Sequence, residues 1–278
     1  MSPASADRTG LTAQQRADLA REAATHQQDF AGVETYCMFI GYPRSGHSLI
    51  GSLLDAHPDM IIAHELDTLQ YVAAGLSREQ LFYLLLDNSH RFTEQGRVWE
   101  EYSYEVKDQW QGRFRTLRVI GDKKGGLSSV RLRRNPTLLD DLRRRVGTRL
   151  KLIHVVRNPF DNISTSLRKK DAPTLEGAID MYFSMAQVVL QVQRQMPRED
   201  FMEVRHETFL EDPAGGLRDL CRFLGQDAPE DYVRDCAAIV KTSPHQSRHD
   251  APWTPQLIEL VRREMQKFPF LDGYSYET

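Results

Sequence analysis

Short, continuous apolar runs recur along this chain, and such runs are typical of strands that are buried on both faces of a sheet. Between them lie longer stretches whose apolar residues recur at helical spacing, such as the stretch that follows residue 48. Alternating strands and helices predict an α/β fold with a mostly parallel central sheet flanked by helices. The predicted strands cover residues 36–40, 60–63, 117–122 and 150–156.

Helical patterns also predict elements around this core. Residues 11–30 have helix-forming composition, and Thr12 is a candidate N-cap. We expect this helix to pack on the core or on a second subunit, so a homodimer is possible. The apolar stripe within residues 181–192 predicts a long core helix, and residues 255–267 predict a final helix.

Two other stretches have a different character. Alternating residues from Tyr102 to Val106, a turn at Gln111 and Gly112 and the apolar residues after it predict a hairpin that leads into the strand at 117–122. Residues 128–146 are basic and helical. We interpret them as a solvated face, and the alternative is a docking surface for an anionic acceptor or a carrier protein.

Composition narrows the class of protein. A chain of 278 residues is long enough for one large domain with a sizeable core, and we expect residues 1–10, which are polar, to be disordered. The net charge of −3 gives no general attraction to nucleic acid. The chain has no apolar run of membrane-spanning length and no apolar secretory leader, and its three cysteines are widely spaced. These features predict a cytoplasmic protein that contacts no membrane and has reduced thiols.

The loop after the first predicted strand carries the strongest chemical signal. Residues 41–48, GYPRSGHS, have the frame of a phosphate-binding loop, with His47 in the place of the usual lysine. A strand, a glycine loop and a helix in this order direct backbone N–H groups and the positive end of a helix toward an anion. Arg44 adds a permanent charge, whereas a histidine is mostly neutral at pH 7. We therefore expect an anion site that is poorly suited to ATP hydrolysis.

The motif continues through residues 54–59, LDAHPD. Together the two segments resemble the 5′-phosphosulfate motif of sulfotransferases that use 3′-phosphoadenosine 5′-phosphosulfate (PAPS), with the closest pattern in the protein-tyrosine sulfotransferases and related bacterial enzymes. The resemblance implies a P-loop-containing nucleotide-binding fold, PAPS as the donor and the desulfated nucleotide PAP as the product. His47 departs from the threonine of that pattern. The resemblance assigns five residues to the 5′-phosphosulfate group: Arg44, Ser45, Gly46, His47 and Ser48.

A second segment of the resemblance begins about a hundred residues later. The predicted strand 150–156 ends at Arg157, and ligands in open α/β sheets bind at such strand ends. In the sulfotransferases this segment supplies an arginine and, eight residues later, a hydroxyl group for the 3′-phosphate. The resemblance therefore assigns Arg157 and Thr165 to the 3′-phosphate, with Ser164 and Ser166 as alternative hydroxyl groups.

Later stretches extend the resemblance. Residues 201–225 resemble a strand and helix of the family and are expected to be mostly structural. In sulfotransferases a late basic loop often closes over the nucleotide, and Arg248 with Ser247 is the candidate here, although the common R-K-G pattern is absent. A lid or gate role for Trp253 is equally open. We expect a single sulfotransferase domain at 11–278, with a helical extension at 11–30, a core at 36–225 and a C-terminal cap at 226–278.

Sulfuryl transfer needs a group that takes the acceptor proton and a cation beside the leaving oxygen, and it demands no metal. Glu65 falls at the spacing of the glutamate base in the tyrosine-sulfotransferase pattern, and His64 is the alternative base. Lys123 fits the register of the lysine that neutralises the bridging oxygen in the family, with Lys124 as the alternative. Arg44 is expected to share the sulfate and phosphate oxygens with this lysine.

We expect a sulfotransferase that moves a sulfuryl group from PAPS to a hydroxyl or amine of a small-molecule acceptor by in-line displacement. The alternative is a P-loop kinase or ATPase, which the similarity of residues 119–122, VIGD, to a Walker B strand favours. A third possibility is a nucleotide-binding scaffold without catalysis. No motif identifies the acceptor, which residues 66–115 and 240–255 are expected to contact.

Overall fold

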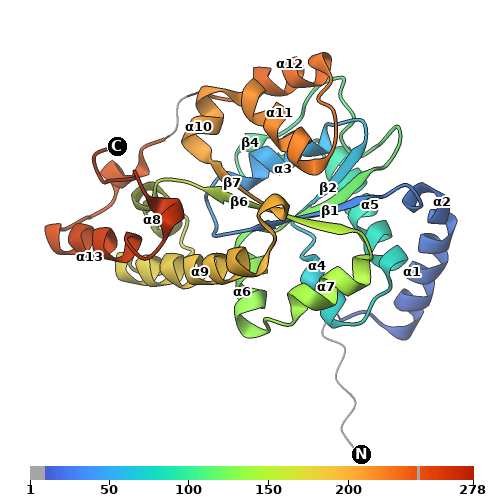
Figure 1. Ribbon diagram of the computed structural model, residues 1–278, viewed down its shortest axis with the longest axis horizontal. Coiled ribbons are helices and arrows are strands. Elements are labelled where there is room, and N and C mark those ends of the chain that lie inside the picture. The colour runs from blue at the N-terminus through green and yellow to red at the C-terminus, as the bar shows by residue number, and fades with distance from the viewer. Residues whose placement is uncertain (1–9, 243–244) are drawn as a thin grey trace, which may run out of the picture.

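A computed structural model describes residues 10–242 and 245–278 (Figure 1). Its centre is a five-stranded sheet in which every neighbouring pair of strands is parallel. The strand order is β2-β5-β1-β6-β7, which confirms the predicted α/β fold. The expectation for residues 1–10 lies, except for Gly10, outside the described residues. The strands are β1 (Thr35–Ile40), β2 (Met60–His64), β5 (Val119–Lys123), β6 (Arg149–Val156) and β7 (Phe201–Arg205).

The central strand β1 is buried on both faces, as its apolar run predicts. Tyr36, Met38 and Ile40 pack into the cluster on one face, whereas Cys37 and Phe39 pack into the cluster on the other. Figure 1 shows α7 and α9 on one side of the sheet and α11 and α12 on the other. The sheet is therefore the middle layer of three.

Two sets of helices form the outer layers. The first cluster receives buried residues from α1 (Ala13–Thr25), α2 (Gln27–Phe30), α4 (Thr68–Ala73), α5 (Arg78–Glu94), α6 (Gly126–Arg134), α7 (Leu138–Val146), α8 (Pro159–Arg168), α9 (Leu175–Gln195) and α13 (Pro255–Met265). The second cluster receives them from α3 (His47–Asp55), α10 (His206–Glu211), α11 (Pro213–Leu224) and α12 (Glu230–Ala238). Short 3-10 turns lie at Arg198–Asp200, Ser247–Asp250 and Pro269–Leu271.

The strand order places a ligand site beyond the carboxyl ends of β1 and β6. After β1 the chain runs to β2 on one side of the sheet, and after β6 it runs to β7 on the other. Adjacent strands whose connections leave in opposite directions create a crevice at their carboxyl ends. The phosphate-loop motif follows β1 and Arg157 follows β6, so both motifs open into this crevice.

Several helix predictions are confirmed. Thr12 caps α1 in a reciprocal arrangement, because its hydroxyl accepts from the backbone of Gln15 while the Gln15 side chain accepts from the backbone of Thr12. The long core helix and the final helix are α9 and α13. The basic stretch forms two helices, α6 and α7, because Pro136 follows Asn135, and a residue before proline disfavours helical geometry.

The predicted hairpin is wrong in its position. The antiparallel ribbon consists of β3 (Val98–Trp99) and β4 (Tyr102–Ser103), and no strand occurs in 104–118, all of which is described. The amide of Gln111 explains the difference. It accepts from the backbone of Val106 and donates to the backbone oxygens of Ser52 and Tyr104, so side-chain hydrogen bonds replace those of a partner strand.

Within 10–242 and 245–278, no helix combines the length and apolar character needed to cross a lipid bilayer. The three cysteines, Cys37, Cys221 and Cys236, are buried and unpaired, as expected.

Candidate active site

A cavity of about 750 Å³ opens beside the carboxyl ends of β1, β5 and β6. Its size is within the range of small-ligand sites. The phosphate loop and α3 form one part of its wall, Glu65 and Lys124 another, and Arg157 and Thr165 a third. The cavity is also lined by residues of the β3–β4 ribbon, of α6 and α10 and of the end of α8, and by Ile239, Lys241, His245 and Ser247. Motifs from distant parts of the sequence thus meet in one cavity.

The phosphate loop has a backbone conformation that favours glycine at residue 46, directly before α3. Gly46 caps α3 with a φ of 98°, a conformation that other residues rarely adopt. A Cβ atom there would lie only 2.4 Å from Nδ1 of His206. The amide of Asn162 on α8 donates to the backbone oxygen of Pro43 at 2.9 Å and braces the loop from the other side. The loop is therefore held in place on both sides.

His47, in the lysine position, is a buried neutral ring. Its two ring nitrogens lie 3.0 and 3.2 Å from the hydroxyl of Ser45. Burial, and then the charge of Lys123, lowers the pKa of His47 to about 3. The imidazole therefore adds no positive charge to the loop at pH 7, as the sequence predicts, and other side chains must supply it.

Arg44 supplies charge at the mouth of the cavity, where two carboxylates already hold it. Asp171 accepts from two of its nitrogens at 2.8 and 2.9 Å, and Glu100 accepts from a third at 2.5 Å. Lys169 pairs with the other oxygen of Glu100 at 3.0 Å. The ribbon turn and the segment after α8 are thereby tied to the phosphate loop, and an anion in the cavity has to share Arg44 with them.

Glu65 lies between two lysines. Lys123 donates to one oxygen of Glu65 at 2.6 Å and to the hydroxyl of Ser48 at 2.9 Å, and Lys124 pairs with the other oxygen at 2.6 Å. The parallel register explains the proximity, because His64 pairs with Lys123 at the ends of β2 and β5. Lys123 is buried, and of the two lysines it is Lys124 that lines the cavity.

This cluster keeps the carboxylate of Glu65 ionised at neutral pH. Burial raises the pKa of Glu65, but the charges and hydrogen bonds of Lys123 and Lys124 outweigh burial, and the pKa lies below its ordinary value. Burial lowers the pKa of Lys123, which the charge of Glu65 opposes. Glu65 is thus an ionised carboxylate at pH 7 and can accept a proton.

His64, the alternative base, is not among the residues that line the cavity. Its ring is buried and stacks on Phe92, with 4.1 Å between the ring centroids. Burial, and then the charge of Lys123, lowers the pKa of His64 to about 3. Of the two base candidates, Glu65 lines the cavity and His64 does not.

Arg157 and Thr165 lie together in the cavity wall, and an Arg157 nitrogen donates to the backbone oxygen of Arg44 in the phosphate loop at 3.3 Å. An Arg157 nitrogen lies 3.4 Å from the hydroxyl of Thr165 and another donates to the backbone oxygen of His245. Ser164 donates to the backbone of α8, and neither it nor Ser166 lines the cavity. Of the three candidate hydroxyl groups, only that of Thr165 belongs to a cavity-lining residue.

The expected position of Arg248 over the nucleotide needs correction. Arg248 is buried and its guanidinium pairs with Asp161 at 2.6 Å, outside the cavity wall. The carboxylate of Asp161 also accepts from the Arg248 backbone at 2.9 Å. A buried carboxylate needs such a partner, so Arg248 fixes the loop to α8. Ser247 and His245 line the cavity instead.

Trp253 also lies outside the cavity wall. Its indole N–H donates to the hydroxyl of Ser164 at 2.9 Å, and its ring packs against Phe160, with 5.2 Å between the ring centroids. Trp253 thus packs against α8, a contact that supports neither the lid nor the gate role.

Sequence analysis missed His206 as a cavity residue, because it lies in a segment that we interpreted as structural. Its ring lies against Gly46, and burial lowers the pKa of His206 to about 4. Within the described residues, Nδ1 of His206 and Nε of Arg157 have no hydrogen-bond partner. Both atoms are buried, so neither is exposed to the cavity that the two residues line.

Asp122, the residue that resembles a Walker B aspartate, is enclosed. Its two oxygens accept from the backbone of Leu66 at 3.2 Å and from the backbone and hydroxyl of Thr68 at 2.7 and 2.9 Å. Burial raises the pKa of Asp122 to about 6. These contacts commit the carboxylate to holding the turn after β2.

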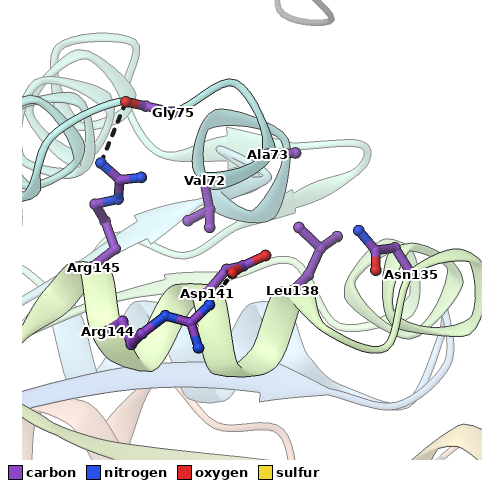
Figure 2. A pocket seen from close by; sticks show the side chains of 8 residues that line it. All are labelled: Val72, Ala73, Gly75, Asn135, Leu138, Asp141, Arg144 and Arg145. Carbon is purple, nitrogen blue, oxygen red and sulfur yellow. Dashed lines mark hydrogen bonds and ion pairs between the residues drawn. The ribbon is translucent and has the colours of Figure 1, made fainter.

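A second pocket lies between α4 and α7, next to the basic stretch (Figure 2). Arg145 donates to the backbone oxygen of Gly75 at 3.4 Å and Arg144 pairs with Asp141. Figure 2 shows both arginines joined to protein oxygens in this way. These contacts favour our interpretation of the stretch as a solvated face.

Comparison with known proteins agrees with the geometry. A model of the sulfotransferase family matches residues 38–230, well over half of the chain. A search of curated proteins finds no significant match.

Solved structures that share the fold include three sulfotransferases. The sulfotransferase domain of the curacin biosynthetic pathway is 14% identical, with a TM-score of 0.54 over 85% of this chain and 98% of that one. Sulfotransferase STF9 from Mycobacterium avium is 12% identical, with a TM-score of 0.51 over 95% and 88%. Sulfotransferase STF1 from Mycobacterium tuberculosis H37Rv is 14% identical, with a TM-score of 0.50 over 90% and 82%. The extent of the family match shows that this chain is an enzyme of the sulfotransferase family.

Proposed function

We propose that the enzyme transfers a sulfuryl group from PAPS to a hydroxyl or amine of a small-molecule acceptor. One observation carries the proposal: the phosphate loop, the Arg157–Thr165 pair and Glu65 line a single cavity. The first two are candidate anion sites that follow different strands, β1 and β6, and two such sites suit a nucleotide with a phosphate at the 3′ position and a phosphosulfate at the 5′ position. Glu65 supplies a base in the same space.

The donor is held at its two ends. Arg44 and the backbone N–H groups of residues 45–48 at the start of α3 bind the 5′-phosphosulfate. The hydroxyl of Thr165 and the guanidinium of Arg157 bind the 3′-phosphate. The ring of His206 lies against Gly46 and supports the backbone of the phosphate loop.

The transfer step then uses the Glu65 cluster. The acceptor oxygen or nitrogen forms a bond to sulfur while the bond from sulfur to the bridging oxygen of the nucleotide breaks. The electron pair of the broken bond stays on the 5′-phosphate oxygen, where Lys123 or Lys124 neutralises the charge. The acceptor proton moves to Glu65, which is ionised because of its two lysine partners.

Comparative nucleotide binding tests the donor site. We expect PAP to raise the melting temperature of the protein more than AMP at the same excess, because PAP alone has a 3′-phosphate. Arg157→Ala should reduce the PAP shift to that of AMP and leave the AMP shift unchanged. Arg149→Ala, which removes a half-exposed arginine at the other end of β6, is the matched control and should keep the difference.

Two outcomes would refute the 3′-phosphate site. One is an equal shift for PAP and AMP in the unmodified protein, and the other is a PAP preference that survives Arg157→Ala. The cytoplasmic location and a homodimer through residues 11–30 stay predictions.

A further inference from the structure

We infer that the β3–β4 ribbon binds the ring of a flat aromatic alcohol, and that such compounds are the acceptors of this enzyme. The inference rests on the proposed function and adds the acceptor class to it. Its basis is the position of the exposed apolar side chains. Among residues 10–242 and 245–278, the large hydrophobic side chains that are exposed are Val98, Trp99, Tyr102 and Leu127.

These exposed side chains gather at the cavity. Trp99, Tyr102 and Leu127 line it, with exposures of 43%, 50% and 36%. Exposed apolar groups that cluster at a cavity mark a ligand-binding surface, whereas isolated ones are ordinary. The clustering therefore needs a ligand with a matching apolar surface.

The ribbon arranges its aromatic rings on one side. Trp99 and Tyr102 are direct cross-strand partners, so their side chains lie on the same face. Tyr104 lies two residues after Tyr102, with 6.4 Å between the ring centroids, and also lines the cavity. Val98, the neighbour of Trp99, does not line the cavity. Two aromatic rings of the ribbon, and that of Tyr104 just after it, thus line the cavity.

The aromatic surface lies next to the reactive groups. The ring of Trp99 lies 5.0 Å from the ring of His64, the residue before Glu65 in the chain. Tyr104 and Ser48 both line the cavity, and the Ser48 hydroxyl accepts from Lys123 at 2.9 Å. A ring that lies on Trp99 and Tyr102 therefore lies in the cavity that Glu65 also lines.

Ion pairs hold this surface over the phosphate loop. Glu100, in the turn of the ribbon, pairs with Arg44 and with Lys169. Lys241 lies 5.7 Å from the centre of the Tyr102 ring and supports it from a third segment. A pre-positioned aromatic wall favours a flat ring over a puckered aliphatic one of equal size, because flat rings stack at full contact.

A pair of matched alcohols tests the inference without turnover. Calorimetry of the protein saturated with PAP would compare 2-naphthol with decahydro-2-naphthol, which has the same carbon skeleton but no aromatic ring. We expect 2-naphthol to bind at least about fivefold more tightly, the scale of an aromatic pair beyond its buried area. Trp99→Ala should remove this preference, and Trp99→Phe should restore most of it.

Val98→Ala is the matched control, because it truncates an exposed apolar residue of the same strand that does not line the cavity. It should keep the preference, and all three variants should bind PAP as the parent does. Equal binding of the two alcohols, no detectable binding of 2-naphthol, or a preference that survives Trp99→Ala would overturn the inference and leave the donor site intact. Loss of PAP binding by the parent would instead refute the donor site itself.

Discussion

At the scale of single residues, the site is built from charges that other parts of the chain satisfy. The carboxylate of Glu65 has a lysine on each oxygen, and Lys123 is buried between Glu65 and Ser48. A buried ammonium group is tolerated only with such partners. The same ion pairs keep Glu65 ionised, so the arrangement that stabilises the fold also prepares the base.

Glu65→Gln separates these two roles. The amide cannot take the acceptor proton, so we expect turnover with PAPS to fall by about 10²- to 10⁴-fold, the usual contribution of a general base. PAP affinity should stay within about threefold, because Glu65 does not contact the nucleotide phosphates in our proposal. Steady-state rates and PAP calorimetry measure the two effects. Glu34→Gln, at an exposed ion pair with Arg118, is the control, and full turnover by Glu65→Gln would remove Glu65 as the base.

At the scale of elements, the β3–β4 ribbon and the segment after α8 control the charge of the phosphate loop. Asp171 accepts two hydrogen bonds from Arg44. The charge of the Arg44 guanidinium is therefore already balanced before PAPS binds. We expect Asp171→Asn to remove one of the two carboxylate charges on Arg44, leaving that of Glu100, and to tighten PAP binding by about three- to tenfold, the scale of one partly exposed charge-assisted contact. Calorimetry of PAP binding tests this result. Asp200→Asn, remote from the cavity and paired with Arg149, should leave affinity unchanged. Weaker PAP binding by Asp171→Asn would show that the carboxylate orients Arg44 instead of competing for it.

The elements differ in how far the sequence predicts them. Strands such as β1 were predictable because burial on both faces demands a continuous apolar run. The two-residue strands of the ribbon carry no such signal, since both are exposed and their position depends on the contacts of Glu100 and Gln111. Arg248 was misplaced for a similar reason. Its partner Asp161 is 87 residues away, and only the fold brings the two together.

At the scale of the whole molecule, buried histidines link stability to pH. His47, His64, His154 and His206 lie in different elements, and burial lowers the pKa of each, to about 3 for the first three and about 4 for His206. An unfolded histidine has a pKa near 6.5. Between pH 6.5 and about pH 4 the unfolded chain therefore binds protons that the folded protein does not, so acid favours unfolding.

The free energy of unfolding should consequently have its full value above pH 7 and should fall as the pH decreases below 6.5. Each buried histidine contributes a slope of up to about 1.4 kcal/mol per pH unit to the free energy of unfolding. By about pH 5, the free energy lost through the four histidines together is comparable to the whole free energy of unfolding of a typical domain, about 5–15 kcal/mol. Urea denaturation from pH 7.5 to pH 5 measures the slope. His64→Phe keeps the stacking on Phe92 and removes one titrating ring, so its slope should be smaller by one proton. His90→Gln, at an exposed position, should keep the parent slope. If the two variants show the same pH dependence, His64 is not a source of the acid sensitivity.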